Sequence, residues 1–147
     1  LLEIASLVHE IGLYVRVGGY HRHSAYLISV APLLGLSKKE KKILSQVVRY
    51  QRKSEPSSTN ETFANMHEED QQKVWRLSAL LRLGIALNKE RRNRVHDINV
   101  EIGHDDITLH IEGEGDLMLE RWATLQTTQY IQLAFDRKLH IDLNLKE

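Results

Sequence analysis

The chain has 147 residues, of which 41% are apolar, enough for one hydrophobic core or two small ones. It contains no cysteine, which excludes disulfides, thiolate metal ligands and cysteine nucleophiles, and which fits a reducing compartment. No apolar run approaches the roughly 20 residues of a membrane span, and no signal-peptide pattern opens the chain. Because the chain starts without methionine inside a helical pattern, we interpret it as a fragment of a longer cytoplasmic protein.

The formal net charge of zero hides a strong asymmetry. Residues 1–94 contain 16 Lys+Arg and 9 Asp+Glu, a balance of +7, whereas residues 95–147 contain 4 and 11, a balance of −7. This asymmetry predicts two structural units, the first of which faces something anionic. The alternative is that the two halves attract each other or a neighbouring subunit.

The N-terminal residues predict two helices. Apolar residues at a spacing of three to four predict a helix over residues 1–15. We expect the Gly18-Gly19 pair to end this helix, because glycine takes positive φ without steric cost. A second helix is predicted over residues 21–34, and Gly35 is its stop signal.

A third helix is predicted to begin at Ser37. Ser37 followed by Glu40 is the capping-box pattern, in which a hydroxyl and a carboxylate satisfy free amides at a helix start. The apolar positions expected to face inward are Ile43, Leu44, Val47 and Val48. Residues 54–69 are rich in Ser, Thr, Asn and Pro and predict a long loop, with a short turn near residues 63–66. The helix expected next, over residues 70–92, is apolar on most sides, which is typical of a central core helix.

From residue 95 the apolar pattern changes from helical to alternating. Residues 98–102 and 107–111 alternate apolar and polar side chains, which predicts two half-buried strands. The segment Gly103-His104-Asp105 between them predicts a hairpin turn, with the glycine at the position of special φ.

The remaining elements complete a mixed fold. Residues 117–119 predict a third strand or a helix start, residues 122–135 a helix, and residues 139–143 a last strand. The predicted fold class is therefore α+β. An all-helical domain over residues 1–93 is followed by a small ββ(β)αβ domain over residues 94–147.

His9 and Glu10 form the first candidate site. A histidine beside an acid on a helix suggests the metal-binding pair of HD-type phosphohydrolases, in which two metal ions clamp a water and a phosphoryl group. Against this hypothesis, glutamate stands where the shorter aspartate is expected. The distant ligand position in the central helix is also occupied by Ile85, which cannot bind a metal. We assign no metal site, and we expect His9 to be hydrogen-bonded within the core.

Cationic side chains recur in the first half of the chain and form the second candidate site. The phosphate-binding candidates are His21, Arg22, His23, Arg49, Arg52, Lys53, Lys89 and Arg92. The first three follow the Gly-Gly turn at a predicted helix start, where free amides and the helix dipole favour an anion. Singly these groups have ordinary explanations, such as a capping histidine or cations at a helix C-terminus. Jointly they predict a surface that binds phosphate.

These motifs resemble one known family. The strings Leu-Val-His9-Glu10-Ile-Gly12-Leu and Gly19-Tyr-His21-Arg22-His23-Ser24 are similar to the C-terminal region of the exopolyphosphatase/guanosine pentaphosphate phosphohydrolase (Ppx/GppA) family. The resemblance continues in residues 48–53 and 80–88 and weakens after Val95. The family usually has histidine where this chain has Gln51, so an amide replaces an imidazole at that position.

The resemblance implies a division of labour. It implies an HD-like helical domain and a small α/β domain that line a channel for inorganic polyphosphate and contribute to a homodimer. It also implies that phosphoanhydride hydrolysis, with Mg, belongs to upstream catalytic domains of the same chain. Residues 1–147 contain no glycine-rich phosphate loop and no Ser/His/Asp spacing that stands out. We therefore expect this chain to hold a polyanion, with no catalytic residue or cofactor of its own.

Two other functions stay open at this point. An independent HD-type metal phosphohydrolase acting on nucleotides would bind a divalent metal at His9. A purely structural dimerisation module would bind protein and show no affinity for polyphosphate. Nucleic acid is disfavoured as a partner, because aromatic residues make up only 6% of the chain and no recognised reader motif occurs.

Overall fold

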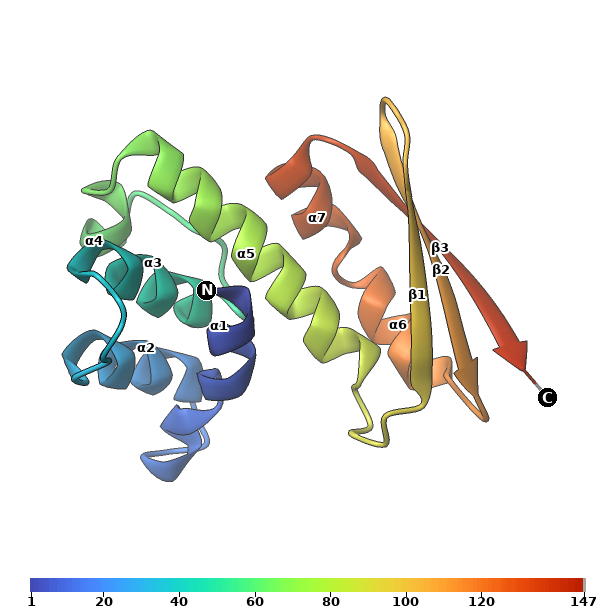
Figure 1. The fold of residues 1–147 in the computed structure, drawn as a ribbon, viewed down its shortest axis with the longest axis horizontal. Helices are drawn as coiled ribbons and strands as arrows, with labels where there is room; N and C mark the ends of the chain where they lie inside the picture. The colour runs from blue at the N-terminus through green and yellow to red at the C-terminus, as the bar shows by residue number, and fades with distance from the viewer. Residues whose placement is uncertain (147) are drawn as a thin grey trace. The chain divides into compact units, whose positions relative to one another are not determined.

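The computed structural model describes residues 1–146, which form two compact units (Figure 1). The first unit comprises Leu1–Leu81 and the second begins at Arg82, so the division falls inside helix α5 (Glu68–Leu87). The first unit is helical and the second contains a three-stranded sheet. This architecture confirms the predicted α+β class. Within the described residues, no helix combines the length and hydrophobicity needed to cross a lipid bilayer.

The N-terminal helix is interrupted, so the predicted helix over residues 1–15 is wrong. Helix α1 (Leu2–Val8) is followed by a short 3-10 helix, η1 (Ile11–Tyr14). The interruption has a tertiary cause in the next helix, α2 (Tyr20–Val30). The Ser24 hydroxyl accepts from the Gly12 N–H at 2.8 Å and donates to the His9 carbonyl at 2.8 Å. Both backbone groups are thereby removed from a continuous helical ladder.

Helix α2 also ends four residues earlier than predicted. Its last residue is Val30, and Ala31 adopts an extended conformation (φ −64°, ψ 144°). The cause is Pro32, because a proline disfavours helical geometry at the residue before it.

Helix α3 (Lys38–Arg49) begins with the predicted capping box. The Ser37 hydroxyl accepts from the Glu40 N–H at 3.2 Å, and the Glu40 carboxylate accepts from the Ser37 N–H at 2.8 Å. The four predicted inward positions are all buried: Ile43, Leu44, Val47 and Val48. Ser45 on the same helix donates to the Ala25 carbonyl at 2.8 Å and so joins α3 to α2.

The predicted loop over residues 54–69 contains one short helix, α4 (Glu61–Ala64). The Asn60 side-chain amide holds this segment against α3 through bonds of 2.7 Å to Gln46 Oε1 and to the Tyr50 hydroxyl. The predicted helix over residues 70–92 is α5, which begins two residues earlier and ends five residues earlier, at Leu87. The cations at Lys89 to Arg94 therefore lie in a loop, and the expectation that they end a helix is wrong. The positive φ values of Arg91 (58°) and Asn93 (51°) are incompatible with a continued helix.

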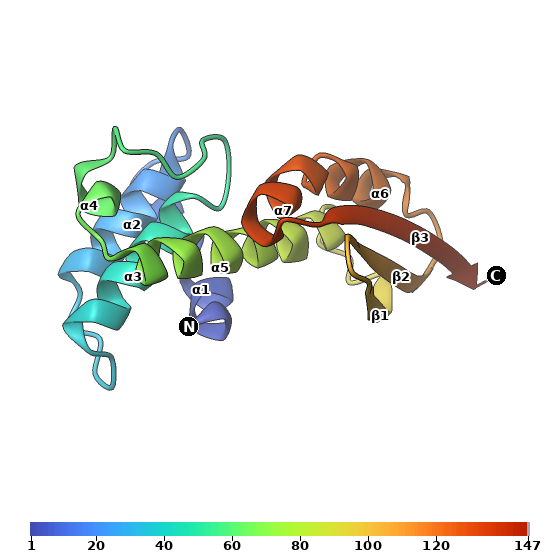
Figure 2. The same ribbon diagram turned by 90° about the horizontal axis from the view of Figure 1, so that it is seen from above.

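The second unit contains one sheet in the order β1-β2-β3. Strand β1 (Val95–Ile102) pairs antiparallel with β2 (Asp106–Glu114), and β2 pairs parallel with β3 (Lys138–Lys146). Helices α6 (Met118–Leu125) and α7 (Thr128–Phe135) form the crossover between β2 and β3 and lie on one face of the sheet (Figure 2). A parallel pair requires such a crossover.

Of the two alternatives for residues 117–119, a strand or a helix start, the structure shows the helix start, because these residues open α6. Two other local predictions for the second unit need correction. The helix predicted over 122–135 is divided between α6 and α7. Gly103 in the hairpin has no positive φ. The nearest atom to a Cβ built at Gly103 would be an oxygen of the flexible Asp106 side chain.

The two faces of this sheet differ in chemistry. Leu109 and Ile111 of β2 are buried together with Leu87 of α5 and form the core of the unit. On the opposite face, the His110 ring lies between carboxylates of both neighbouring strands, at 3.1 Å from Asp142 and 3.5 Å from Glu101. The hydrogen bond that the His110 ring donates to the Asp142 carboxylate is the main reason that the pKa of His110 is raised.

Removing the capping box should destabilise the helical unit measurably. We expect Ser37→Ala to lower the free energy of unfolding by about 1 kcal/mol, because the Glu40 N–H at the start of α3 loses its partner. The matched control is Ser29→Ala, since the exposed Ser29 hydroxyl bonds only to the Tyr26 carbonyl three residues back. Chemical denaturation of both variants checks the prediction, and equal effects of the two substitutions would contradict it.

Candidate functional site: a cationic cluster around His21

His21 is a buried imidazole at the start of a helix. Its side chain is 3% exposed, and its Nδ1 atom is buried with no hydrogen-bond partner among the described residues. Gly19, with φ 74°, directs the chain into α2 just before it. The Tyr20 ring packs edge-on against the imidazole, with ring centroids 6.2 Å apart. A buried polar atom without a partner is uncommon in native structures, and it marks this position as a functional candidate.

Four cationic side chains surround this imidazole. They are Arg22 on α2, Arg49 in the last turn of α3, and Arg52 and Lys53 directly after α3. Burial is the main reason that the pKa of His21 falls from 6.5 to about 4, and the four cations lower it further. The Arg52 guanidinium lies over the Tyr20 ring, 5.1 Å from its centroid. At neutral pH the site therefore presents a neutral imidazole within a group of cations, which favours an anionic ligand.

The backbone of His9 holds the elements of this site together. The His9 carbonyl accepts from the Ser24 hydroxyl of α2 at 2.8 Å and from the Gln51 side-chain amide at 2.6 Å. Gly12 lies so close to α2 that a Cβ there would be 2.1 Å from the Tyr20 carbonyl oxygen. The segment around residues 9–12 is thus fixed against α2 and against the end of α3.

The side chains of His9 and Glu10 are neighbours with local contacts. The His9 Nδ1 donates to the Ser6 carbonyl at 2.7 Å, and its Nε2 lies 3.9 Å from the Glu10 carboxylate. Within residues 1–146, no group of three His, Cys, Asp or Glu residues is placed to hold a metal ion.

Comparison with known proteins shows where these motifs belong. A family model described as "Ppx/GppA phosphatase, domain III" matches residues 1–138. The chain belongs to the Ppx/GppA phosphatase family. The resemblance found in the sequence motifs is thereby confirmed.

Two curated relatives support the same assignment. Both are named guanosine-5'-triphosphate,3'-diphosphate pyrophosphatase and come from two strains of Vibrio cholerae serotype O1, Classical Ogawa 395 and El Tor Inaba N16961. Each is 33% identical to this chain over 116 residues, which are 78% of this chain and 22% of the relative. The matched region therefore spans about a fifth of the length of these Ppx/GppA proteins.

Gln51 departs from the usual Ppx/GppA motif, and the structure shows what its side chain does. It is 3% exposed, and its amide nitrogen bonds to the His9 carbonyl. Its amide oxygen is buried with no hydrogen-bond partner in the described part of the chain. The Gln51 amide thus links the end of α3 to the backbone of His9, beside the cationic cluster.

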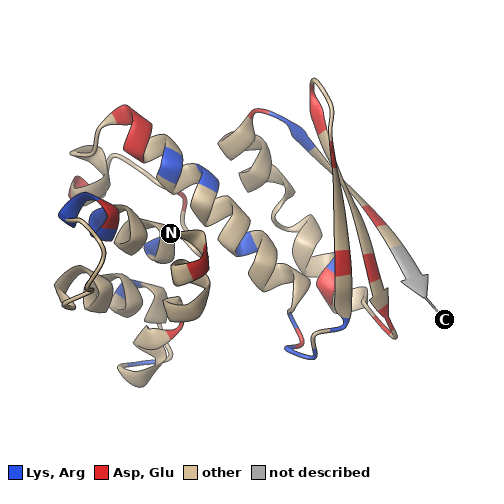
Figure 3. Cartoon of the chain, viewed as in Figure 1, with Lys and Arg blue, Asp and Glu red and all other residues tan. Residues whose placement is uncertain are grey.

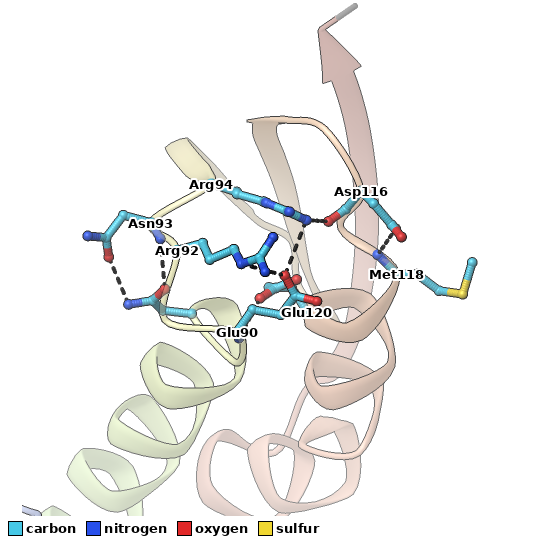
Figure 4. A network of polar contacts seen from close by, with 8 residues as sticks. Glu90, Arg92, Asn93, Arg94, Asp116, Met118 and Glu120 are labelled. Carbon is cyan, nitrogen blue, oxygen red and sulfur yellow. Dashed lines mark hydrogen bonds and ion pairs between the residues drawn. The ribbon is translucent and has the colours of Figure 1, made fainter.

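Lys89 and Arg92 belong to a different setting in the second unit. They lie in the loop between α5 and β1, where Arg92 Nε is 3.6 Å from the Glu90 carboxylate and Arg94 pairs with the same carboxylate at 3.3 Å (Figure 4). The buried Glu120 carboxylate of α6 accepts from the Glu90 N–H at 2.8 Å. Arg92 and Arg94 therefore share an acidic neighbour within their own unit, which favours the His21 cluster as the anion site.

Some residues of the cluster were predicted from the sequence and others were not. Arg22, Arg49, Arg52 and Lys53 were all expected at an anion site and all lie near His21. His23 lies half-buried two positions further along α2 and is not among the residues that shift the pKa of His21. Tyr20 was missed, although an aromatic residue next to the candidate histidine was a usable signal.

Gly12 should tolerate no side chain. We expect Gly12→Ala to lower the free energy of unfolding by about 3 kcal/mol, because the new Cβ would overlap the backbone of α2 at Tyr20 and Ser24. Gly84→Ala is the matched control, since a Cβ there meets nothing within 4 Å and alanine favours the helix by about 0.5–1 kcal/mol. Thermal or urea denaturation of the two variants measures the difference, and a neutral Gly12→Ala would refute the close packing.

The buried imidazole should also give the protein a characteristic acid sensitivity. The unfolded chain takes up a proton at His21 near pH 6.5, whereas the folded chain does so only near pH 4. Stability is therefore lost as the pH falls through this window, by about 3 kcal/mol. Denaturation curves between pH 7 and pH 4 should show a shallower loss in His21→Gln than in the unaltered protein. Parallel pH profiles for the two proteins would contradict the assignment.

Proposed function

We propose that this chain is the polyphosphate-binding module of a Ppx/GppA phosphatase. The observation that carries the proposal is the group of four cations around a buried imidazole whose Nδ1 has no hydrogen-bond partner among residues 1–146. The helical unit that bears this group, with its excess of Lys and Arg, contrasts with the acidic strands of the second unit (Figure 3). Inorganic polyphosphate is the anion that several spaced cations would hold best.

The physics of the proposal is that of polyanion binding. Polyphosphate carries about one negative charge per phosphate. When protein cations bind to it, the counterions of the polymer are released, as they are when proteins bind nucleic-acid backbones. Arg49, Arg52 and Lys53 would contact successive phosphates, and the imidazole of His21 would supply a hydrogen bond that a neutral ring can make. Arginine suits this role, because its planar fork matches the geometry of phosphate oxygens.

Such a module would retain a long chain between successive cleavages. In the proposed arrangement, hydrolysis of the phosphoanhydride bond belongs to catalytic domains elsewhere in the protein, which would bind Mg. Binding energy gained at remote phosphates then positions the terminal phosphate for reaction. The proposal further includes an HD-like ancestry of the helical unit, a homodimeric assembly and a cytoplasmic location.

Guanosine pentaphosphate is the alternative substrate of the whole protein. The name of the Vibrio cholerae relatives favours it, and its phosphates present the same chemistry to the cluster. Chain-length dependence separates the two, because four spaced cations gain from a long polyphosphate and little from a nucleotide with two short phosphate groups.

Reversing the cluster charges should abolish retention of long chains. We expect a full-length protein carrying Arg49→Glu, Arg52→Glu and Lys53→Glu to bind long-chain polyphosphate at least about 100-fold more weakly, because three phosphate contacts become repulsive. The unaltered protein should lose affinity steeply with salt, and the slope should fall by about 0.7 to 0.9 per lost contact. Fluorescence anisotropy with labelled polyphosphate, at salt concentrations from roughly 50 to 200 mM, measures both the affinity and its salt dependence.

The matched control is Lys38→Glu on the same helix. Lys38 is exposed at the start of α3, where a carboxylate also suits the helix dipole, so its reversal changes net charge without touching the cluster. Unchanged affinity in the triple variant, or an equal loss in both variants, would reject the proposal.

A further inference from the structure

Strand β1 presents an open edge of the sheet. The strand order is β1-β2-β3, so within the described residues only β2 pairs with β1. The other side of β1 therefore carries a row of backbone N–H and C=O groups that no strand of this chain satisfies. Exposed edges of this kind are templates for pairing with another strand, and proteins usually cover or blunt them.

Strand β1 also exposes apolar side chains. They lie on the face of the sheet on which the apolar side chains of β2 are buried. Ile98 and Val100 are 39% and 52% exposed, and Ile102 at the end of the strand is 70% exposed. Their cross-strand partners on β2 include Ile111 and Leu109, which are 1% and 4% exposed. The apolar face of the sheet thus continues over β1, where the described residues cover it only in part.

The sequence of β1 is complementary to itself in one register. For two copies related by a two-fold axis perpendicular to the sheet, residues on the same face must lie opposite one another. An axis at Val100 places Ile98 opposite Ile102 of the partner subunit and Asn99 opposite Glu101 of the partner subunit. This register pairs apolar with apolar side chains and an amide with a carboxylate.

Neighbouring registers are less favourable for electrostatic reasons. An axis at Asn99 would place Asp97 opposite Glu101 twice, and an axis at Glu101 would place that carboxylate opposite itself. Like charges directly opposite one another destabilise a strand pair. An axis at Ile98 would set Val100 against His96 and shorten the apolar row.

We propose that β1 pairs antiparallel with β1 of a second copy of this chain, about a two-fold axis at Val100, so that the sheet continues across the homodimer. The inference rests on the homodimer of the proposed function and adds to it the surface and the register. A single strand pair buries less area than the roughly 1,200–2,000 Å² of a standard stable interface. The pairing is therefore one part of the dimer interface and sets its alignment.

Cysteine cross-linking tests the register directly, because the chain has no cysteine of its own. In the full-length protein, with any cysteine outside this chain replaced by serine, Val100→Cys should form a disulfide-linked dimer on mild oxidation. Residues opposite each other in an antiparallel pair have Cα atoms about 4.5–5.5 Å apart, within disulfide range. Ile98→Cys is the control, since its two copies would lie about 13 Å apart along the strands. Cross-linking of both variants alike, or of neither, would overturn the proposed register.

A second measurement uses exposed positions that leave the fold intact. Val100→Lys should raise the dimer dissociation constant about tenfold or more, because two like charges would meet at the axis. Asn99→Lys on the opposite face of the same strand is the control, and it should weaken the dimer less because its new cation faces Glu101 of the partner. Sedimentation equilibrium measures both. A full-length protein that is monomeric, or a dimer that Val100→Lys leaves unchanged, would overturn the inference. Polyphosphate anisotropy on the same samples reports on the cationic cluster separately.

Discussion

The carbonyl oxygen of His9 is the point on which the helical unit depends. It accepts hydrogen bonds from a hydroxyl on α2 and from an amide at the end of α3, so one backbone atom ties three segments that are distant in sequence. These bonds interrupt the N-terminal helix and allow Gly12 to lie against the first turn of α2. The buried imidazole of His21 lies in that same first turn of α2.

The burial of His21 has an electrostatic consequence. A protonated ring would have to share a desolvated position with four neighbouring cations, and the ring therefore stays neutral down to about pH 4. The site thus combines positive charge with an unsatisfied polar atom, the Nδ1 of His21. An incoming phosphate could balance the charge and pair with that atom. The second unit differs, because Arg92 and Arg94 in the loop after α5 already pair with the Glu90 carboxylate.

Local sequence signals predicted much of this architecture. The capping box at Ser37 and Glu40 depends only on residues three apart, and it forms as expected. The alternating strands after residue 95 and the inward face of α3 also follow from periodicity alone. Two of the wrong predictions trace to a contact from a distant segment and to an overlooked proline. The N-terminal helix is broken by Ser24, and α2 ends early at Pro32, which restricts the residue before it.

By itself, the sequence determined the α+β class, the family and the presence of spaced cations, because periodicity, motifs and charge are properties of neighbouring residues. Only the tertiary structure decided which cations share a site. Arg49, Arg52 and Lys53 come together with Arg22 because α2 and α3 pack against each other. Lys89 and Arg92 lie instead in a loop of the second unit, where Arg92 pairs with Glu90. The burial of His21 was likewise invisible in the sequence. A residue's pKa depends on the water that packing removes and on charges brought near it in space, and neither quantity is local along the chain.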